Sequence, residues 1–426
     1  MIKTYLTGLL LLLAHAKLAA QDKVDTVRLT PNAAEKIFLD NNLPLLAEKL
    51  NIKQGEAKIL QAKAWPNPTF TLDELQVYKN ATTEDIPPVV GNFWRDRNFA
   101  FQFEQLILTA RKRQKNISLE TRNKEMAEIA FTDLLYALKA EFRQTMFEIQ
   151  YLQQISKSYQ IQLIEVNKLL AAQEIQFKNG HTSQAELFRL KGLAISLKGE
   201  LNEHGEELNA LQKSLKSMMN ANPHSFIILE DAFNTQTINH IRAIDLAQVF
   251  LQSSQNTKLI AAKQQVKIDE AQLAIEKANR VPDVNLIANF DRAGSTMRNF
   301  VGLGFSVDIP AFNRNKGNIR AAQFEVQKSN LFQQNTANEL QHSLVQHFTD
   351  LQQAMQLYTS IDTDYMQKLD DMTSAIGRNF AARNISLLEF LDYYESFRDS
   401  KEQYYGAIKD ILIKKENLNY LVGGEL

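Results

Sequence analysis

The chain contains no cysteine, and it has only 15 glycines and 9 prolines in 426 residues. The missing cysteine excludes a disulfide framework, thiolate metal ligands, a cysteine nucleophile and a lipid attached to an N-terminal cysteine. The scarcity of glycine and proline argues against a compact, loop-rich architecture. The formal charge of -1, with acidic and basic residues well mixed, gives no support for a nucleic-acid partner and fits long solvated helix faces.

A long apolar run is also absent, apart from one at the N-terminus. A basic start is followed there by an apolar core at residues 6–13 and small residues up to Ala20. This pattern predicts a signal peptide over residues 1–20, with cleavage after Ala16 and an uncleaved anchor as the alternatives. The run is shorter than the roughly 20 apolar residues of a membrane-spanning helix. We therefore expect an exported protein that enters a membrane, if at all, as strands.

One stretch of sequence, residues 43–78, occurs twice, and its second copy begins at Leu259. Each copy is a helical pattern that stops at a proline, Pro66 or Pro282, and continues with alternating apolar residues. A proline ends the helical ladder and favours extended geometry before it, so the switch has a local cause. Such self-similarity constrains the whole fold. It predicts a first repeat over residues 21–223, a linker over 224–242 and a second repeat over 243–426.

Long helices are predicted in both repeats. Residues 92–179 contain neither glycine nor proline, and a helix over about 109–177 would be on the order of 100 Å long. Within it a heptad pattern predicts a coiled coil, with seam positions at Leu138, Phe142, Thr145, Ile149, Leu152, Ser156, Tyr159, Leu163, Val166 and Leu170. In the second repeat we expect one helix over 243–279 and another that continues without a break to Gly377.

Two tight helical hairpins are predicted, one in each repeat. Gly180 suits a left-handed C-terminal cap, and Ser183 with Glu186 forms a capping-box pattern for the next helix. Ser386 and Glu389 repeat this capping-box spacing in the second half of the chain.

Four segments alternate in the manner of strands that are apolar on one face, each about 10 residues long, which is the length that crosses an outer membrane. Trp65 and Trp94 lie beside strand ends, where membrane interfaces place aromatics, although ordinary core aromatics are the alternative. Four strands cannot close a membrane barrel, and an open edge in lipid leaves backbone groups unpaired. If these strands enter lipid, the protein must oligomerise.

No catalytic, cofactor-binding or metal site is predicted. The seven histidines form no HExxH motif, and His342 and His347 do not share a helix face well. The segment Gly302–Gly304 lies within a predicted strand and lacks the strand-to-helix setting of a phosphate loop. We therefore expect a protein that is not an enzyme.

The duplicated halves, the helix-to-proline junctions and the paired hairpin tips together resemble the TolC-like outer-membrane efflux factors over the mature chain. Residues 309–317 and 104–113 resemble the heavy-metal-cation branch, which usually has glycine where Ala110 and Arg111 stand. The resemblance implies a mainly α fold with a membrane β-barrel contribution. Four strands per protomer would close a 12-stranded β-barrel in a homotrimer, continued by an α-helical barrel.

The resemblance also implies a function and partners. The protein would be the outer-membrane exit duct of a tripartite RND-type efflux system, with its helical part in the periplasm. It would contact outer-membrane lipid, a periplasmic membrane-fusion adaptor and an inner-membrane RND pump, and heavy-metal cations are the implied substrate class. A duct for drug efflux or type I protein secretion is the alternative, followed by a soluble periplasmic coiled-coil scaffold.

Particular residues match the family's functional positions. Glu389 and Asp392 match acidic residues of the periplasmic aperture, where three copies would form a carboxylate ring that favours cations. Arg383 stands where the family often has glycine. The residues expected to contact the adaptor lie at the two hairpin tips and are Gly180, Ser183, Glu186, Arg383, Asn384 and Ser386.

Overall fold

The structure is a computed structural model that describes residues 26–76, 98–230, 235–292, 297–361 and 363–426. The predicted signal peptide and Trp94 lie outside these residues. The chain divides into two compact units. Unit 1 comprises Met1–Ala47, Phe131–Thr257 and Asn338–Leu426, and unit 2 comprises Glu48–Ala130 and Lys258–Ala337.

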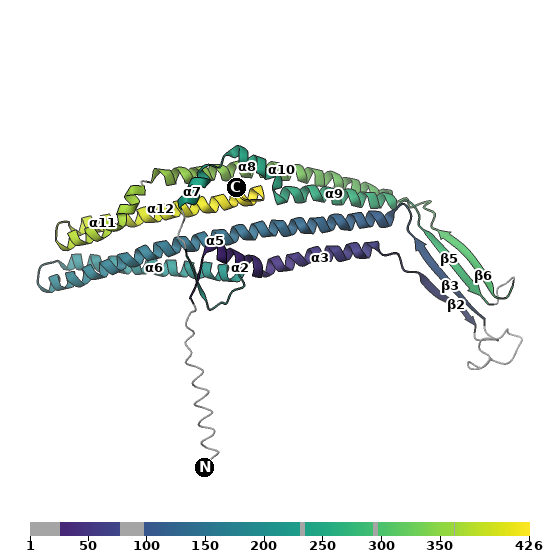
Figure 1. The fold of residues 1–426 in the computed structure, drawn as a ribbon, viewed down its shortest axis with the longest axis horizontal. Coiled ribbons are helices and arrows are strands. Elements are labelled where there is room, and N and C mark those ends of the chain that lie inside the picture. The colour runs from purple at the N-terminus through teal and green to yellow at the C-terminus, as the bar shows by residue number, and fades with distance from the viewer. Residues whose placement is uncertain (1–25, 77–97, 231–234, 293–296, 362) are drawn as a thin grey trace, which may run out of the picture. The chain divides into compact units, whose positions relative to one another are not determined.

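The described chain is mainly helical, with six strands (Figure 1). In chain order the elements are β1 (Thr26–Leu29), α2 (Pro31–Asn41), α3 (Leu43–Lys63), β2 (Thr69–Gln76), β3 (Asn98–Ile107), α5 (Lys112–Lys178), α6 (Gln184–Met218), β4 (Phe226–Leu229), α7 (Thr235–Arg242), α8 (Leu246–Gln252), η1 (Ser253–Gln255), α9 (Thr257–Ala278), β5 (Val284–Asp291), β6 (Phe300–Val307), α10 (Lys316–Ser360), α11 (Thr363–Ala381) and α12 (Leu387–Val422). The segment predicted as a linker, 224–242, contains β4 and α7.

Unit 2 is built around a four-stranded sheet with the order β2-β3-β5-β6, in which every neighbouring pair is antiparallel. The helix-to-strand switch occurs where the prolines predict it, because α3 ends before Pro66 and α9 ends before Pro282. Residues 100–107 of β3 pair in continuous register with β5. The β3–β5 ladder therefore joins segments that are far apart in the sequence.

Unit 1 contains two helical hairpins, α5 with α6 and α11 with α12 (Figure 1). Their shared core is a cluster of buried side chains that includes Ile155, Val166, Leu190, Phe380 and Phe390. A second cluster surrounds Phe38 of α2, whose ring stacks on Phe142 with centroids 4.5 Å apart. Beside it, β1 pairs in parallel with β4.

The coiled-coil seam of α5 follows the prediction throughout its first part, but only at alternate positions after Leu152. Of the predicted seam positions, those buried include Phe142, Ile149, Leu152, Tyr159 and Val166. Ile155, Gln162 and Leu169 are buried where Ser156, Leu163 and Leu170 were expected. A straight helix drifts from a seven-residue repeat, and the apolar Ile155 is a better core residue than Ser156.

Two predicted helices are interrupted, so those predictions were wrong. The helix expected over 243–279 consists of α8, η1 and α9, and Ser253 and Ser254 bond back to the carbonyls of Phe250 and Leu251 at this break. Such side chains compete with the helical ladder. The helix expected to run to Gly377 ends at Ser360, whose hydroxyl bonds to the carbonyl of Leu357 before α11 begins.

Candidate functional site

The first hairpin tip joins α5 to α6. Gly180 has φ 74°, the left-handed value that favours glycine, and the amide of His181 closes the end of α5 on the carbonyl of Gln176. Ser183 caps α6, because its side chain accepts a hydrogen bond from the amide of Glu186 at 3.2 Å. The predicted capping box is only half formed, since the Glu186 carboxylate accepts from the Thr182 hydroxyl instead.

The second tip joins α11 to α12 and has the complete predicted capping box. The Glu389 carboxylate accepts hydrogen bonds from the amide and the hydroxyl of Ser386, at 2.7 and 2.8 Å. The Ser386 hydroxyl accepts in turn from the Glu389 amide. These bonds, first from the Ser386 backbone and then from its hydroxyl, lower the pKa of Glu389, which is exposed and carries a negative charge at neutral pH.

The two tips are connected by Arg383, which has φ 60° and occupies the left-handed position of the second tip. Its guanidinium donates to the backbone carbonyl of His181 in the first tip at 3.0 Å and to the Gln176 side chain at 3.4 Å. The backbone amide of Asn384, the next residue, donates a hydrogen bond to the backbone carbonyl of Asn379 within the second tip. Arg383 therefore joins two predicted tip segments that are distant in sequence.

The predicted aperture residues lie on one side of α12. Glu389 and Asp392 are three residues apart and both are exposed, so their side chains share a helix face. Glu389 is fixed by the capping box, whereas Asp392 lies one turn further along the helix. The pair therefore places two neighbouring carboxyl side chains beside the second tip.

The sheet of unit 2 has two chemically different faces. Cross-strand rows on one face are apolar, and they run Leu72–Phe101–Phe290–Val301 and Phe70–Phe103–Ala288–Leu303. On the opposite face the rows Thr71–Gln102–Asn289–Gly302 and Thr69–Glu104–Ile287–Gly304 are mainly polar. Much of the apolar face is open to solvent, with Leu303 at 86% and Phe305 at 76% exposure. An apolar face of this kind requires a covering surface.

The junctions beside the sheet are fixed by polar contacts. The carboxylate of Asp283, just before β5, accepts from the Thr109 amide at 2.8 Å and forms an ion pair with Lys112 at 2.8 Å. Trp65, just before β2, is 57% exposed, with the Arg113 guanidinium 4.6 Å from its ring centroid. Trp65 is therefore not a core residue.

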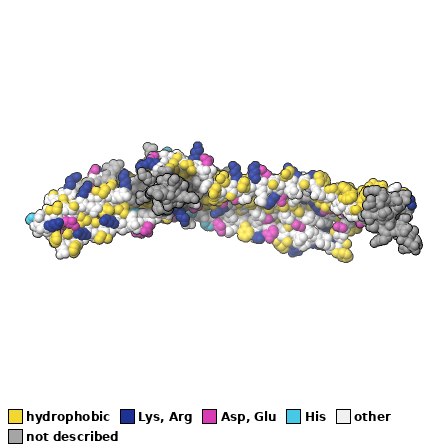
Figure 2. Space-filling model, turned by 90° about the horizontal axis from the view of Figure 1, so that it is seen from below, with side chains coloured by type: hydrophobic (Ala, Val, Ile, Leu, Met, Phe, Trp, Pro, Cys, Tyr) yellow, Lys and Arg dark blue, Asp and Glu magenta, His cyan; other side chains and the backbone are white. Residues whose placement is uncertain are grey.

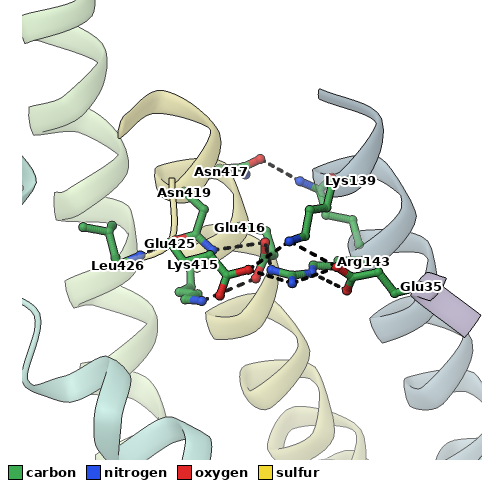
Figure 3. Close-up of polar contacts among 10 residues, drawn as sticks. Glu35, Lys139, Arg143, Lys415, Glu416, Asn417, Asn419, Glu425 and Leu426 are labelled. Carbon is green, nitrogen blue, oxygen red and sulfur yellow. Dashed lines mark hydrogen bonds and ion pairs between the residues drawn. The ribbon is translucent and has the colours of Figure 1, made fainter. Parts of the chain in front are cut away.

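A charged cluster in unit 1 was not predicted (Figure 3). The Arg143 guanidinium of α5 pairs with Glu35 of α2 at 2.9 Å, with Glu416 of α12 at 3.1 Å and with Glu425 at 2.9 Å. Lys139 also contacts Glu35 and Glu425. No local sequence pattern reveals this cluster, because the three partners of Arg143 lie 108, 273 and 282 residues away.

These contacts shift the ionisation of two carboxyls. A hydrogen bond from Lys139, followed by contacts with Arg143, lowers the pKa of Glu425 to about 2. Burial alone would raise the pKa of Glu35, but hydrogen bonds and charges from Arg143 and Lys139 lower it. Both carboxyls are charged at neutral pH, and they hold α2 and residues 423–426 against α5.

The surface in Figure 2 carries Lys and Arg side chains interspersed with Asp and Glu, as the mixed sequence predicts. Among the described residues, no group of three or more His, Cys, Asp or Glu side chains is arranged to hold a metal ion.

Helical membrane spans are likewise not found in the described part of the chain, where no helix is both long and apolar enough to cross a bilayer.

Solved structures share the fold of this chain. One is a crystal structure of CusC from work on its folding and transmembrane channel formation. Its TM-score to this chain is 0.71 at 16% sequence identity, and the match covers 95% of this chain and 96% of CusC. A membrane protein from Pseudomonas aeruginosa has a TM-score of 0.74 at 13% identity, over 95% of this chain and 92% of that one. The fold is that of a TolC-like outer-membrane channel protein, as predicted.

Sequence comparison finds similarity to outer-membrane efflux proteins. Residues 251–424 match the family model described as Outer membrane efflux protein. Over 392 residues the chain is 21% identical to the Cobalt-zinc-cadmium resistance protein CzcC of Cupriavidus metallidurans, which covers 89% of this chain and 86% of that protein. The predicted resemblance to outer-membrane efflux proteins is therefore supported as a similarity of sequence and of fold.

Proposed function

We propose that three copies of this chain form the exit duct of a tripartite RND-type efflux system that carries heavy-metal cations from the periplasm to the outside. The observation that carries the proposal is the amphipathic four-stranded sheet of unit 2. Its apolar face suits lipid and its polar face suits a water-filled lumen. A soluble coiled-coil scaffold would have no use for such a sheet.

The edges of that sheet support a trimer. Among the described residues, no strand pairs with the outer edge of β2 or of β6. An unpaired edge in lipid costs several kcal/mol per backbone group, so the wall must close. Three copies would place β6 of one protomer beside β2 of the next and complete a 12-stranded barrel, above the minimum of about eight strands.

Heavy-metal cations are proposed as substrate on three grounds. The relative CzcC is named for cobalt, zinc and cadmium resistance, and residues 309–317 resemble the heavy-metal branch of the family. The exposed carboxyl side chains of Glu389 and Asp392 would form a ring in a trimer. Rings of carboxylates favour cations over anions.

The hairpin tips are proposed to dock on a periplasmic adaptor, which would connect the duct to an inner-membrane RND pump. Gly180, Ser183 and Glu186 of the first tip are exposed, as are Arg383, Asn384 and Ser386 of the second. Trp65, and Trp94 beside the next strand, are proposed to lie at the membrane interface. The leader over residues 1–20 and the two-repeat organisation stay predictions.

Gating is proposed to occur by separation of the tips. The Arg383 contact with the first tip would hold the hairpins together in the resting channel. Adaptor binding would replace this contact and let the helices around the second tip twist outward.

The substrate class is tested in a strain that lacks the chain's gene. We expect greater sensitivity to cobalt, zinc, cadmium or copper, restored by the intact chain, with unchanged sensitivity to organic dyes and antibiotics. Sensitivity to organic compounds alone would replace the metal duct by a drug duct, and retention of a secreted protein alone would replace it by a secretion duct.

A further inference from the structure

The four helix–strand junctions of unit 2 carry a local excess of cations. They lie at one end of the sheet, because β2 and β5 begin where β3 and β6 end (Figure 1). The connecting segments are residues 63–68, 108–115, 279–283 and 308–316, of which the second includes the first turn of α5. Together they contain eight lysine or arginine residues and two aspartates. The whole chain has 48 basic and 49 acidic residues, so the junctions depart from its balance.

Most of this excess charge is not neutralised within the chain. Lys112 is paired with Asp283 at 2.8 Å, and Arg113 lies over the Trp65 ring, 4.6 Å from its centroid. Asp308 is the other carboxyl of these segments and is exposed. Within the described residues, five exposed cations of the junctions form no ion pair, and they are Lys63, Arg111, Arg280, Arg314 and Lys316. They are therefore free to bind an anionic partner.

At three of the four junctions an exposed apolar side chain lies between the strand and the cation. These pairs are Trp65 with Lys63 before β2, Val281 with Arg280 before β5, and Phe312 with Arg314 after β6. Phe312 is fully exposed. A membrane leaflet has the same order, because its charged headgroups lie beyond its acyl chains. An acidic protein surface in water would need no apolar layer between the cations and the sheet, so this order favours lipid.

We propose that the junction cations bind the phosphate groups of anionic phospholipids in the membrane leaflet nearest the helices. This rests on the proposed insertion of the unit 2 sheet into the membrane. The exposed apolar side chains would lie among the upper acyl chains, and the lysine and arginine side chains would extend to the phosphates beyond them. A guanidinium can donate two parallel hydrogen bonds to one phosphate, which suits Arg111, Arg280 and Arg314 to this partner.

The test is the fluorescence of Trp65 in a Trp94→Phe protein, in which Trp65 is the sole tryptophan. The protein is reconstituted in vesicles of phosphatidylcholine with a minor fraction of phosphatidylglycerol. An equal, minor amount of lipid carries bromine on its acyl chains in each of two preparations, as phosphatidylglycerol in one and as phosphatidylcholine in the other. Bromine quenches a tryptophan that it contacts. We expect phosphatidylglycerol to be enriched beside Trp65 about fivefold and to quench more strongly, with a smaller excess at high salt.

A variant with three exposed cations removed tests the junction itself. Lys63→Gln, Arg280→Gln and Arg314→Gln together should abolish the excess quenching by brominated phosphatidylglycerol. Quenching by brominated phosphatidylcholine should persist, because Trp65 would still lie at the membrane. The matched control removes the same charge from exposed helix sites outside the junctions, through Lys36→Gln, Lys49→Gln and Lys263→Gln, and should keep the excess.

Two results would overturn the binding of anionic lipid. One is equal quenching of Trp65 by the two brominated lipids, which would leave the cations to an acidic protein surface. The other is an excess that survives in the junction variant. A Trp65 that neither lipid quenches would contradict the insertion of the sheet as well, so failure of the lipid proposal can be distinguished from failure of the channel proposal.

Discussion

The guanidinium of Arg383 donates a hydrogen bond to the backbone carbonyl of His181 at 3.0 Å, across 202 residues of sequence. Arg383 belongs to the α11–α12 tip and His181 to the α5–α6 tip. The backbone of Arg383 is in the left-handed conformation, with φ 60°. Left-handed geometry costs a non-glycine residue roughly 1–2 kcal/mol, so the contact is made at a local conformational cost.

Loss of this contact should make the channel easier to open. Arg383→Ala removes the donor, and an exposed charged contact contributes up to about 1 kcal/mol, so the ratio of open to closed channels should rise up to about fivefold. Arg383→Gly removes the same contact but relieves the left-handed backbone, so its thermal midpoint should exceed that of Arg383→Ala. Conductance in planar bilayers measures the first effect and thermal melting the second. Arg378→Ala, at an exposed site on α11, serves as the control. Equal opening in all three variants would show that the Arg383 contact does not hold the channel closed.

The carboxyl pair on α12 should determine cation preference. Asp392→Asn removes a negative charge, and Glu389→Gln removes the other while it keeps an oxygen for the Ser386 cap. Each change should move the reversal potential in a salt gradient toward zero, and the double change should move it further. Glu203→Gln, an exposed site on α6, should have no effect. Ion selectivity that survives the double change would remove these residues from the pore.

The Arg143 cluster should control stability in acid. Glu35 and Glu425 have pKa values below the ordinary 4.5, and that of Glu425 falls to about 2. A carboxyl of lowered pKa stabilises the fold above its unfolded pKa, and this contribution disappears as the pH falls through the folded value. For Glu425 the loss should therefore extend from about pH 4.5 to about pH 2.

Arg143→Met should destabilise the protein at pH 7 by about 3 kcal/mol, because it leaves partly buried carboxylates unpaired. It should also move the acid unfolding transition to higher pH, because Glu35 and Glu425 then lose a cation that lowers their pKa. Thermal melting between pH 3 and pH 8 measures both effects. Lys198→Met, at an exposed site on α6, provides the comparison, and parallel pH profiles for the two variants would show that the cluster is not a source of acid stability.

The two faces of the sheet should tolerate charge differently. Leu286 and Asn285 are neighbours on β5 and lie on opposite faces of the sheet. Leu286 is opposite Phe305 of β6, and Asn285 is opposite Ser306. Leu286→Arg should cost about 2–4 kcal/mol on a lipid-facing surface, whereas Asn285→Arg should be tolerated in a lumen. The amount of each variant in the outer-membrane fraction measures the difference. Equal amounts would argue against lipid contact on the Leu286 face.

Local signals in the sequence predict the parts of the fold that depend on neighbouring residues. Pro66 and Pro282 mark the helix-to-strand switches, and Gly180 and Ser386 mark the tips, because a proline or a cap acts on the residues next to it. Helix continuity is less predictable. At the breaks after Ser360 and at Ser253, the serine hydroxyl donates a hydrogen bond to a backbone carbonyl of the preceding turn. Such hydrogen bonds weaken a helix but do not prevent one, so the sequence alone does not reveal these breaks.

Contacts between distant segments could not be predicted. Arg143 and Glu416 are individually ordinary helix residues, and only the packing of α5 against α12 brings them together. Arg383 could be placed at a tip from the sequence, but its bond to His181 requires both tips to lie side by side. The shift of the α5 seam to Ile155 likewise depends on the partner helices that cover it.

In the proposed trimer, two further copies of the chain close the open edges of β2 and β6. Light scattering on the protein extracted by detergent from an isolated outer-membrane fraction tests this most directly, with the detergent mass subtracted. We expect the protein mass of three chains. A protein mass of one chain, or recovery of the protein in the soluble periplasmic fraction, would contradict the account.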